Sequence, residues 1–135
     1  MLKDDAIKYY KEGYNCAESI IRGANDYYDL KLHDHDMKMV AAFGIGLQVG
    51  DTCGALNSAA CVISSKYIET KAHDNPRELQ KITSTLVKSF EDKMGSRLCP
   101  KVRAKYFTPE LRCQNTVSHT CDILETVIND CEASK

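Results

Sequence analysis

Apolar side chains recur three and four residues apart along most of this chain, and this spacing constrains the fold more than any other feature. The clearest stripe lies in residues 76–94 and consists of Leu79, Ile82, Leu86, Phe90 and Met94. No segment of useful length alternates apolar and polar residues in the way that marks a half-buried strand. The sequence therefore predicts an all-α fold of about five helices in a compact bundle or array, without a sheet.

Capping residues, glycines and prolines set the expected helix boundaries. Asn75-Pro76 and Thr108-Pro109 each combine a helix cap with proline at the first helical position, and Gly95 is placed to end a helix. The segment 96–107 is expected to be irregular or a short helix interrupted at Cys99-Pro100. The expected helices cover residues 4–28 with a break at Gly13-Tyr14, 33–43, 53–70, 76–94, and the segment from Thr108 onward. A length of 135 residues predicts a single domain, 1–135, with a core of its own.

Charge and hydropathy exclude several classes of function. Lys and Arg number 18 against 19 Asp and Glu, so no basic field attracts nucleic acid or anionic lipid. The longest apolar run, residues 39–49, is too short to span a bilayer, and residues 1–5 lack the apolar core of a signal peptide. We expect a cytoplasmic protein that binds neither nucleic acid nor membrane. A homodimer is the base-rate expectation for its assembly.

A glycine-rich segment, residues 43–55, leads into the third expected helix. Its glycines loosen the backbone, and Asp51 or Thr52 is expected to cap the helix. Cys53 is then expected in the first helical turn, where free N–H groups and the helix dipole favour a thiolate. This position makes Cys53 a candidate redox thiol.

The cysteines are enriched and widely spaced. They are Cys16, Cys53, Cys61, Cys99, Cys113, Cys121 and Cys131. Because the cytosol keeps thiols reduced, enrichment there indicates metal binding or redox chemistry rather than structural disulfides. Four of them, Cys16, Cys53, Cys99 and Cys113, lie at or near expected helix ends or in a loop, and only a tertiary fold could gather them. From the pattern alone, buried cysteines that act as small apolar residues explain the enrichment equally well.

Several segments together resemble one family over nearly the whole chain. They are Tyr14-Asn15-Cys16-Ala17-Glu18, the glycines Gly44, Gly46 and Gly50, Cys53-Gly54-Ala55, residues 90–99 and Cys113. The chain resembles the C_GCAxxG_C_C family of redox proteins, whose four recurring cysteines correspond to Cys16, Cys53, Cys99 and Cys113. It departs from the family signature where Ser58 replaces the last glycine of CGAxxG, and where Ile45 and Leu47 interrupt the glycine run.

The resemblance also suggests a cofactor. The family is similar to the non-haem part of split-Soret cytochromes, which is associated with an iron–sulfur cluster. This chain lacks a CxxCH motif, so the resemblance implies no haem.

Three hypotheses follow, and whether the protein is an enzyme stays open. In the first, Cys16, Cys53, Cys99 and Cys113 hold an iron–sulfur cluster, or zinc as the alternative metal, and the protein transfers electrons to an unknown redox partner. In the second, a pair of these cysteines performs thiol–disulfide or persulfide chemistry without metal, with Cys53 as the nucleophile. In the third, the chain is a non-catalytic helical binding or scaffold protein. Cys61 and Cys121 are expected in the core, and Cys131 is expected to be a surface thiol near a fraying C-terminus.

Overall fold

The computed structural model describes residues 1–135 and consists of helices and connecting turns. The all-α prediction is confirmed, since only two isolated β-bridges occur and no strand forms. There are seven α-helices rather than about five. The α-helices are α1 (Leu2–Lys11), α2 (Cys16–Tyr28), α3 (Asp34–Lys38), α4 (Gly54–Tyr67), α5 (Pro76–Met94), α6 (Cys99–Tyr106) and α7 (Gln114–Ala133). Short turns of other helix types are η1 (Ala41–Phe43), η2 (Gly46–Gly50) and η3 (Ala72–Asp74).

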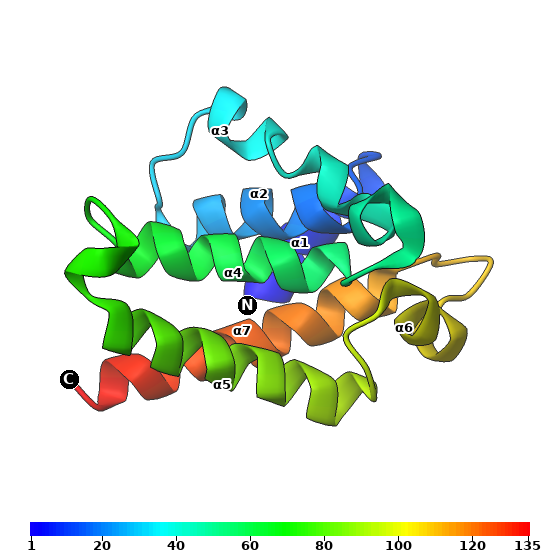
Figure 1. Ribbon diagram of the computed structural model, residues 1–135. Coiled ribbons are helices and arrows are strands. Elements are labelled where there is room, and N and C mark those ends of the chain that lie inside the picture. Colours follow the sequence, from blue (N-terminus) through cyan, green and yellow to red (C-terminus); the bar gives the residue numbers. More distant parts are fainter.

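The five longer helices α1, α2, α4, α5 and α7 pack into one bundle, while α3 and α6 lie outside it (Figure 1). The core includes the fully buried Ile20, Ile63, Leu86, Phe90 and Leu124, each of which stabilises the fold by roughly 1.5–3 kcal/mol. Helices α2, α4 and α7 all begin at the same end of the bundle, at the right in Figure 1, beside α6. None of the helices combines the length and the apolar character required to cross a bilayer.

The first two expected helices are each divided in the structure, the first as predicted and the second not. The predicted break at Gly13 is confirmed, because this glycine has φ +107° and separates α1 from α2. The expected helix over 33–43 is wrong in its length. The helix α3 has five residues and η1 follows after a turn, because the chain must enter a left-handed turn that begins at Ile45, with φ 54°.

The expected start of the last helix is also wrong. Thr108 and Arg112 instead close a turn, in which the Arg112 N–H donates to the Thr108 carbonyl at 2.6 Å. Arg112 has φ 52°, a left-handed conformation that an α-helix cannot contain, so α7 begins only at Gln114. Upstream, Pro100 lies in the first turn of α6 and does not interrupt it, because proline lacks only an N–H that a first turn leaves free. The expected helix over 76–94 is confirmed as α5, which Gly95 ends.

Candidate functional site

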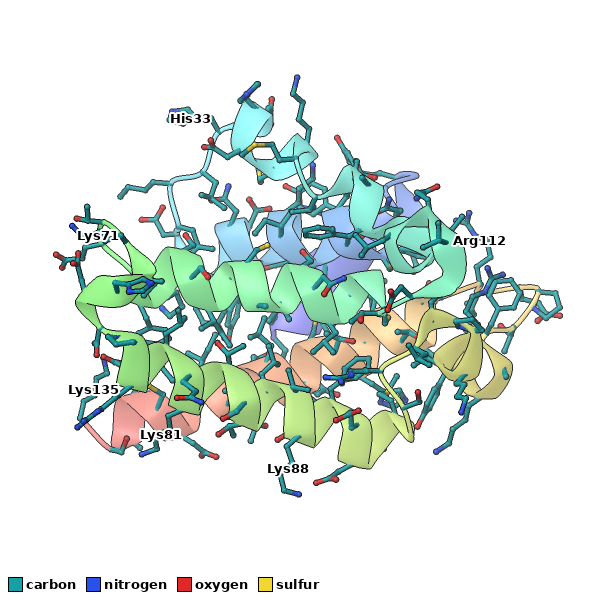
Figure 2. The ribbon with its side chains drawn as sticks, viewed as in Figure 1. His33, Lys71, Lys81, Lys88, Arg112 and Lys135 are labelled. Carbon is teal, nitrogen blue, oxygen red and sulfur yellow. The ribbon has the colours of Figure 1, made fainter.

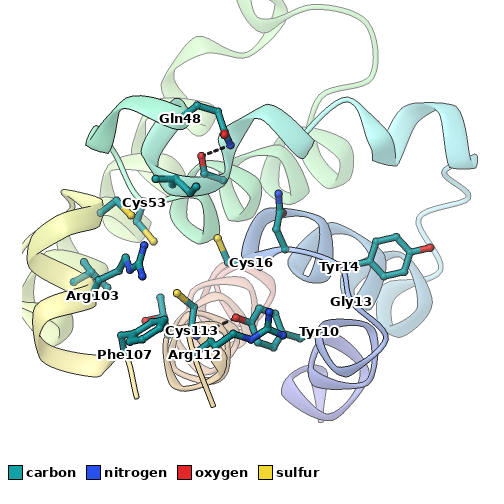
Figure 3. Close-up of a pocket in the computed structure, with 16 residues that line it drawn as sticks. Tyr10, Gly13, Tyr14, Cys16, Gln48, Cys53, Arg103, Phe107, Arg112 and Cys113 are labelled. Atoms are coloured by element: carbon teal, nitrogen blue, oxygen red, sulfur yellow. Dashed lines mark hydrogen bonds between the residues drawn. The ribbon is translucent and has the colours of Figure 1, made fainter. Parts of the chain in front are cut away.

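Four cysteines lie at the N-termini of four helices. Cys16 and Cys99 are the first residues of α2 and α6, whereas Cys53 and Cys113 immediately precede α4 and α7. All four line one cavity of about 320 Å³ (Figure 3). The fold thus brings together the four cysteines selected from the sequence, and we call this space the cysteine cavity.

A capping box fixes the start of α2 and therefore the position of Cys16. The Glu18 N–H donates to Asn15 Oδ1 at 2.9 Å, and Glu18 Oε1 accepts from the Asn15 N–H at 3.0 Å. Asn15 Nδ2 also donates to the Ala41 carbonyl at 3.0 Å. These bonds tie the helix that carries Cys16 to the segment that leads toward Cys53.

A short antiparallel bridge holds the segments of Cys53 and Cys99 side by side. The Cys53 N–H donates to the Arg97 carbonyl at 2.7 Å, and the Cys99 N–H donates to the Asp51 carbonyl at 2.8 Å. Cys53 is therefore the residue before α4 rather than part of its first turn. The expected cap by Asp51 or Thr52 is wrong, because the residue before α4 is Cys53. Asp51 Oδ1 instead accepts from the neighbouring Thr52, from its N–H at 2.8 Å and from its Oγ1 at 3.3 Å.

Close packing behind Cys53 explains the glycine that follows it. A Cβ atom on Gly54 would lie 2.6 Å from the Phe43 carbonyl oxygen and 3.2 Å from Cys16 Sγ. Ser58, one turn further along α4, is fully buried and donates from Oγ to the Ala17 carbonyl at 2.6 Å. The serine that departs from the family signature thus fits between α4 and α2 with its hydroxyl satisfied.

Aromatic and basic side chains complete the wall near Cys113 (Figure 3). The Cys113 N–H donates to the Tyr10 hydroxyl at 2.9 Å. The Arg112 guanidinium lies 5.2 Å from the Tyr10 ring centroid, and the Arg103 guanidinium lies 4.6 Å from that of Phe107. Neither arginine forms an ion pair with a carboxylate. No sequence pattern singled out Tyr10 or Arg112, although Arg112 is the direct neighbour of Cys113.

A left-handed turn forms the opposite wall. Its φ values are 54° at Ile45, 58° at Gly46, 58° at Leu47 and 64° at Gln48. Each non-glycine residue in this conformation costs roughly 1–2 kcal/mol. Gln48 Nε2 donates to the Gly44 carbonyl at 2.7 Å and closes the turn, as the dashed line in Figure 3 shows. The residues that interrupt the glycine run are therefore held in a strained backbone beside the cysteines.

A comparison with known families agrees with the four-cysteine arrangement. Residues 14–127 match the family described as "Putative redox-active protein (C_GCAxxG_C_C)". The chain belongs to this family. Neither the curated proteins nor the solved structures include a match to the chain.

Burial governs the protonation of the four family cysteines. It raises the pKa of Cys16 to about 12, and it also raises the pKa values of Cys99 and Cys113. The other three thiols raise the pKa of Cys16 further, because neighbouring thiolates would repel each other. The Arg103 guanidinium acts in the opposite direction on the pKa values of Cys99 and Cys113. Without added positive charge, the cavity therefore favours neutral thiols.

The expected activation of Cys53 as a free thiolate is not found. Burial raises the pKa of Cys53 to about 11, although the amides of Ala55 and Leu56 at the start of α4 lower it. The helix N-terminus thus acts in the expected direction, but desolvation outweighs it.

The other three cysteines lie outside the cavity. Cys121 is fully buried in α7, as expected, and Cys61 is half-buried in α4. Cys131 differs from the expectation, since it is half-buried within α7 and packs against the core. No three Cys, His, Asp or Glu side chains lie close enough together to hold a single metal ion.

Proposed function

We propose that this protein transfers electrons by means of an iron–sulfur cluster that Cys16, Cys53, Cys99 and Cys113 hold in the cysteine cavity. The observation that carries the proposal is the convergence of four thiols, each at a helix N-terminus, on one cavity. Four cysteine thiolates are the usual ligand set of such clusters.

The electrostatics of the cavity suit an anionic group. Each helix N-terminus favours a negative charge by roughly 0.3–1 kcal/mol at exposed sites and by up to about 2 kcal/mol where partly buried. Arg103 and Arg112 add two guanidinium groups that have no carboxylate partner of their own. Burial alone would protonate these thiolates, whereas positively charged iron bound among them would stabilise them. This chemistry fits a ligand set with raised thiol pKa values.

The spacing of the thiols favours a cluster over zinc. Tetrahedral coordination with Zn–S bonds of about 2.3 Å requires sulfur atoms about 3.8 Å apart. No group of three ligands in the structure lies close enough for one ion, whereas the four thiols surround a cavity of about 320 Å³. In a cluster the four thiolates would be shared among two or more iron atoms, so no single iron would require three of them.

Protein groups around the cavity have distinct tasks in this proposal. When bound, the cluster supplies one-electron oxidation and reduction. Buried residues such as Val102 and Thr116 would shield the inner side of the cavity from water. The Asn15 capping box, together with the bridge between the Cys53 and Cys99 segments, holds the thiols in place. Tyr10 positions Cys113 through its hydroxyl. Arg103 and Arg112 offset the negative charge, which makes reduction easier.

The test is anaerobic purification followed by a visible absorption spectrum and analysis of iron, acid-labile sulfide and zinc. We expect iron and sulfide in near-stoichiometric amounts, with loss of both in Cys16→Ser, Cys53→Ser, Cys99→Ser and Cys113→Ser. Cys61→Ser is the matched control, because Cys61 is half-buried but lies outside the cavity. Protein that contains neither iron nor sulfide would refute the proposal.

The same purification separates the alternatives. In a metal-free redox protein, two thiols lose two electrons and two protons to a disulfide or quinone acceptor and form one disulfide bond. The bridge that places the Cys53 and Cys99 segments side by side favours these two as the pair. Thiol titration before and after oxidation would then differ by two thiols. Unreactive thiols and absent metal would instead indicate the scaffold hypothesis.

A further inference from the structure

The exposed apolar side chains of this protein gather around the cysteine cavity. Nine large apolar residues are exposed, and six of these nine lie in two segments, 45–49 and 98–111, that form or flank the cavity walls. We call these six the apolar rim: Ile45, Leu47, Val49, Leu98, Phe107 and Leu111. Ile45 and Phe107 line the cavity itself, and Val49 is 79% exposed. A cluster of this kind marks an interaction surface more often than scattered exposure does.

The backbone holds part of the rim outward at a conformational cost. Leu47 and Ile45 have positive φ, which a leucine or β-branched residue rarely adopts. Asparagine or glycine would fit this turn with less strain, so stability alone does not account for apolar residues there. Strained segments of this kind cluster at functional sites.

The charge of the surrounding surface is positive. Residues 97–112 contain five Lys and Arg against one Glu, a net charge of +4, in a chain whose net charge is −1. The other 119 residues therefore carry −5. Arg103 and Arg112 lie at the cavity without carboxylate partners, and Arg112 is labelled at the right of Figure 2. An apolar centre with unpaired cations is complementary to a partner that has an acidic face.

We propose that the apolar rim docks an acidic electron-carrier protein directly over the cysteine cavity. This inference rests on the proposed redox function, because a carrier must approach the buried redox group closely. Two copies of the chain joined symmetrically through this face would place net charges of +4 against each other, which opposes self-association there. The carrier's carboxylates would instead pair with Arg103 and Arg112, and its apolar centre would cover Leu47 and Val49.

The probe is a plant-type [2Fe–2S] ferredoxin, a small acidic carrier, and its binding to the purified protein is measured by calorimetry. We expect a complex whose affinity falls at least about tenfold between low and high salt, because the cations are at the surface. Leu47→Asn combined with Val49→Ser, and separately Arg112→Glu, should each weaken binding by about tenfold or more. Asparagine tolerates positive φ, so the double variant keeps the fold.

Two matched controls lie away from the rim. Lys81→Glu reverses a charge on α5, toward the opposite end of the molecule from Arg112 in Figure 2, and Met39→Ser removes another exposed apolar side chain. Neither should change binding of the ferredoxin. Absent binding at low salt, or equal binding by the rim variants and the controls, would overturn the proposal.

Further measurements distinguish the ferredoxin from two other partners of the apolar rim, a second copy of the chain and a membrane surface. A dimer in sedimentation that the double variant dissociates would assign the rim to a second copy and overturn the proposal. Rim-dependent binding to phosphatidylserine–phosphatidylcholine vesicles would overturn it in favour of a membrane surface. Calorimetry on protein with and without iron separates the two proposals. If a protein that never contains iron still binds ferredoxin through the apolar rim, the docking proposal holds and only the iron–sulfur proposal is refuted.

Discussion

Replacement of Gly54 by alanine tests how tightly α4 is seated behind the cysteine cavity. On helix propensity alone, Gly54→Ala should stabilise the protein by at most about 0.5–1 kcal/mol, the value for a helix interior, since Gly54 is the first residue of α4. The structure predicts the opposite sign. The new methyl group would lie 2.6 Å from the Phe43 carbonyl oxygen, and contacts below 3.0 Å are essentially never observed. The two segments must therefore separate by at least 0.4 Å, the difference between these distances.

The magnitude follows from two opposing contributions. Overpacking of a tight interior costs about 1–3 kcal/mol, and the gain in helix propensity offsets part of this cost. We expect a net loss of about 0.5–2 kcal/mol in the free energy of unfolding. The same methyl group would lie 3.2 Å from Cys16 Sγ, so this thiol must shift by a few tenths of an ångström. Iron content per chain should therefore fall together with stability.

Urea denaturation followed by circular dichroism measures the stability change. Ser65 is an exposed residue of α4, so Ser65→Ala compared with Ser65→Gly gives the propensity difference on the same helix without a steric clash. We expect alanine to be the more stable residue at position 65 and the less stable residue at position 54. If Gly54→Ala stabilises the protein as much as the control pair indicates, the steric argument is refuted.

Three further predictions concern the walls of the cavity. Leu47→Gly should raise the free energy of unfolding by about 0.5–1 kcal/mol, because relief of positive φ exceeds the entropy cost of glycine, and an unchanged urea midpoint would contradict this. Tyr10→Phe leaves the Cys113 N–H without its acceptor and should lower the free energy of unfolding by about 1–2 kcal/mol in the same assay, whereas wild-type stability would show that the bond is dispensable. In metal-free protein, the raised pKa of Cys53 means that the folded state keeps its proton longer than the unfolded state, so stability should be constant near neutral pH and fall from pH 9.0 to about 11. The decline in stability with pH should be shallower in Cys53→Ala. An identical pH profile in this variant would contradict the raised pKa of Cys53.

The sequence by itself determined the class of fold and the identity of the candidate cysteines. Apolar spacing of three and four residues is a local property, so it predicted α5 together with the glycine that ends it. The motif around Cys53 and the distant Cys16, Cys99 and Cys113 were also legible. The helix boundaries were harder to predict from the sequence. The turn before Cys113, for example, depends on a left-handed Arg112, which no local preference of arginine predicts.

Only the tertiary structure decided where these cysteines lie and whether their thiols keep their protons. The sequence suggested that the start of α4 would activate Cys53, yet burial among other thiols raises its pKa instead. Desolvation depends on every segment that covers a group, and those segments come from distant parts of the chain. The joint start of α2, α4 and α7 at one end of the bundle, with α6 beside them, is likewise a result of packing (Figure 1). Local patterns set each helix, but only the contacts between helices could bring four of their N-termini around one cavity.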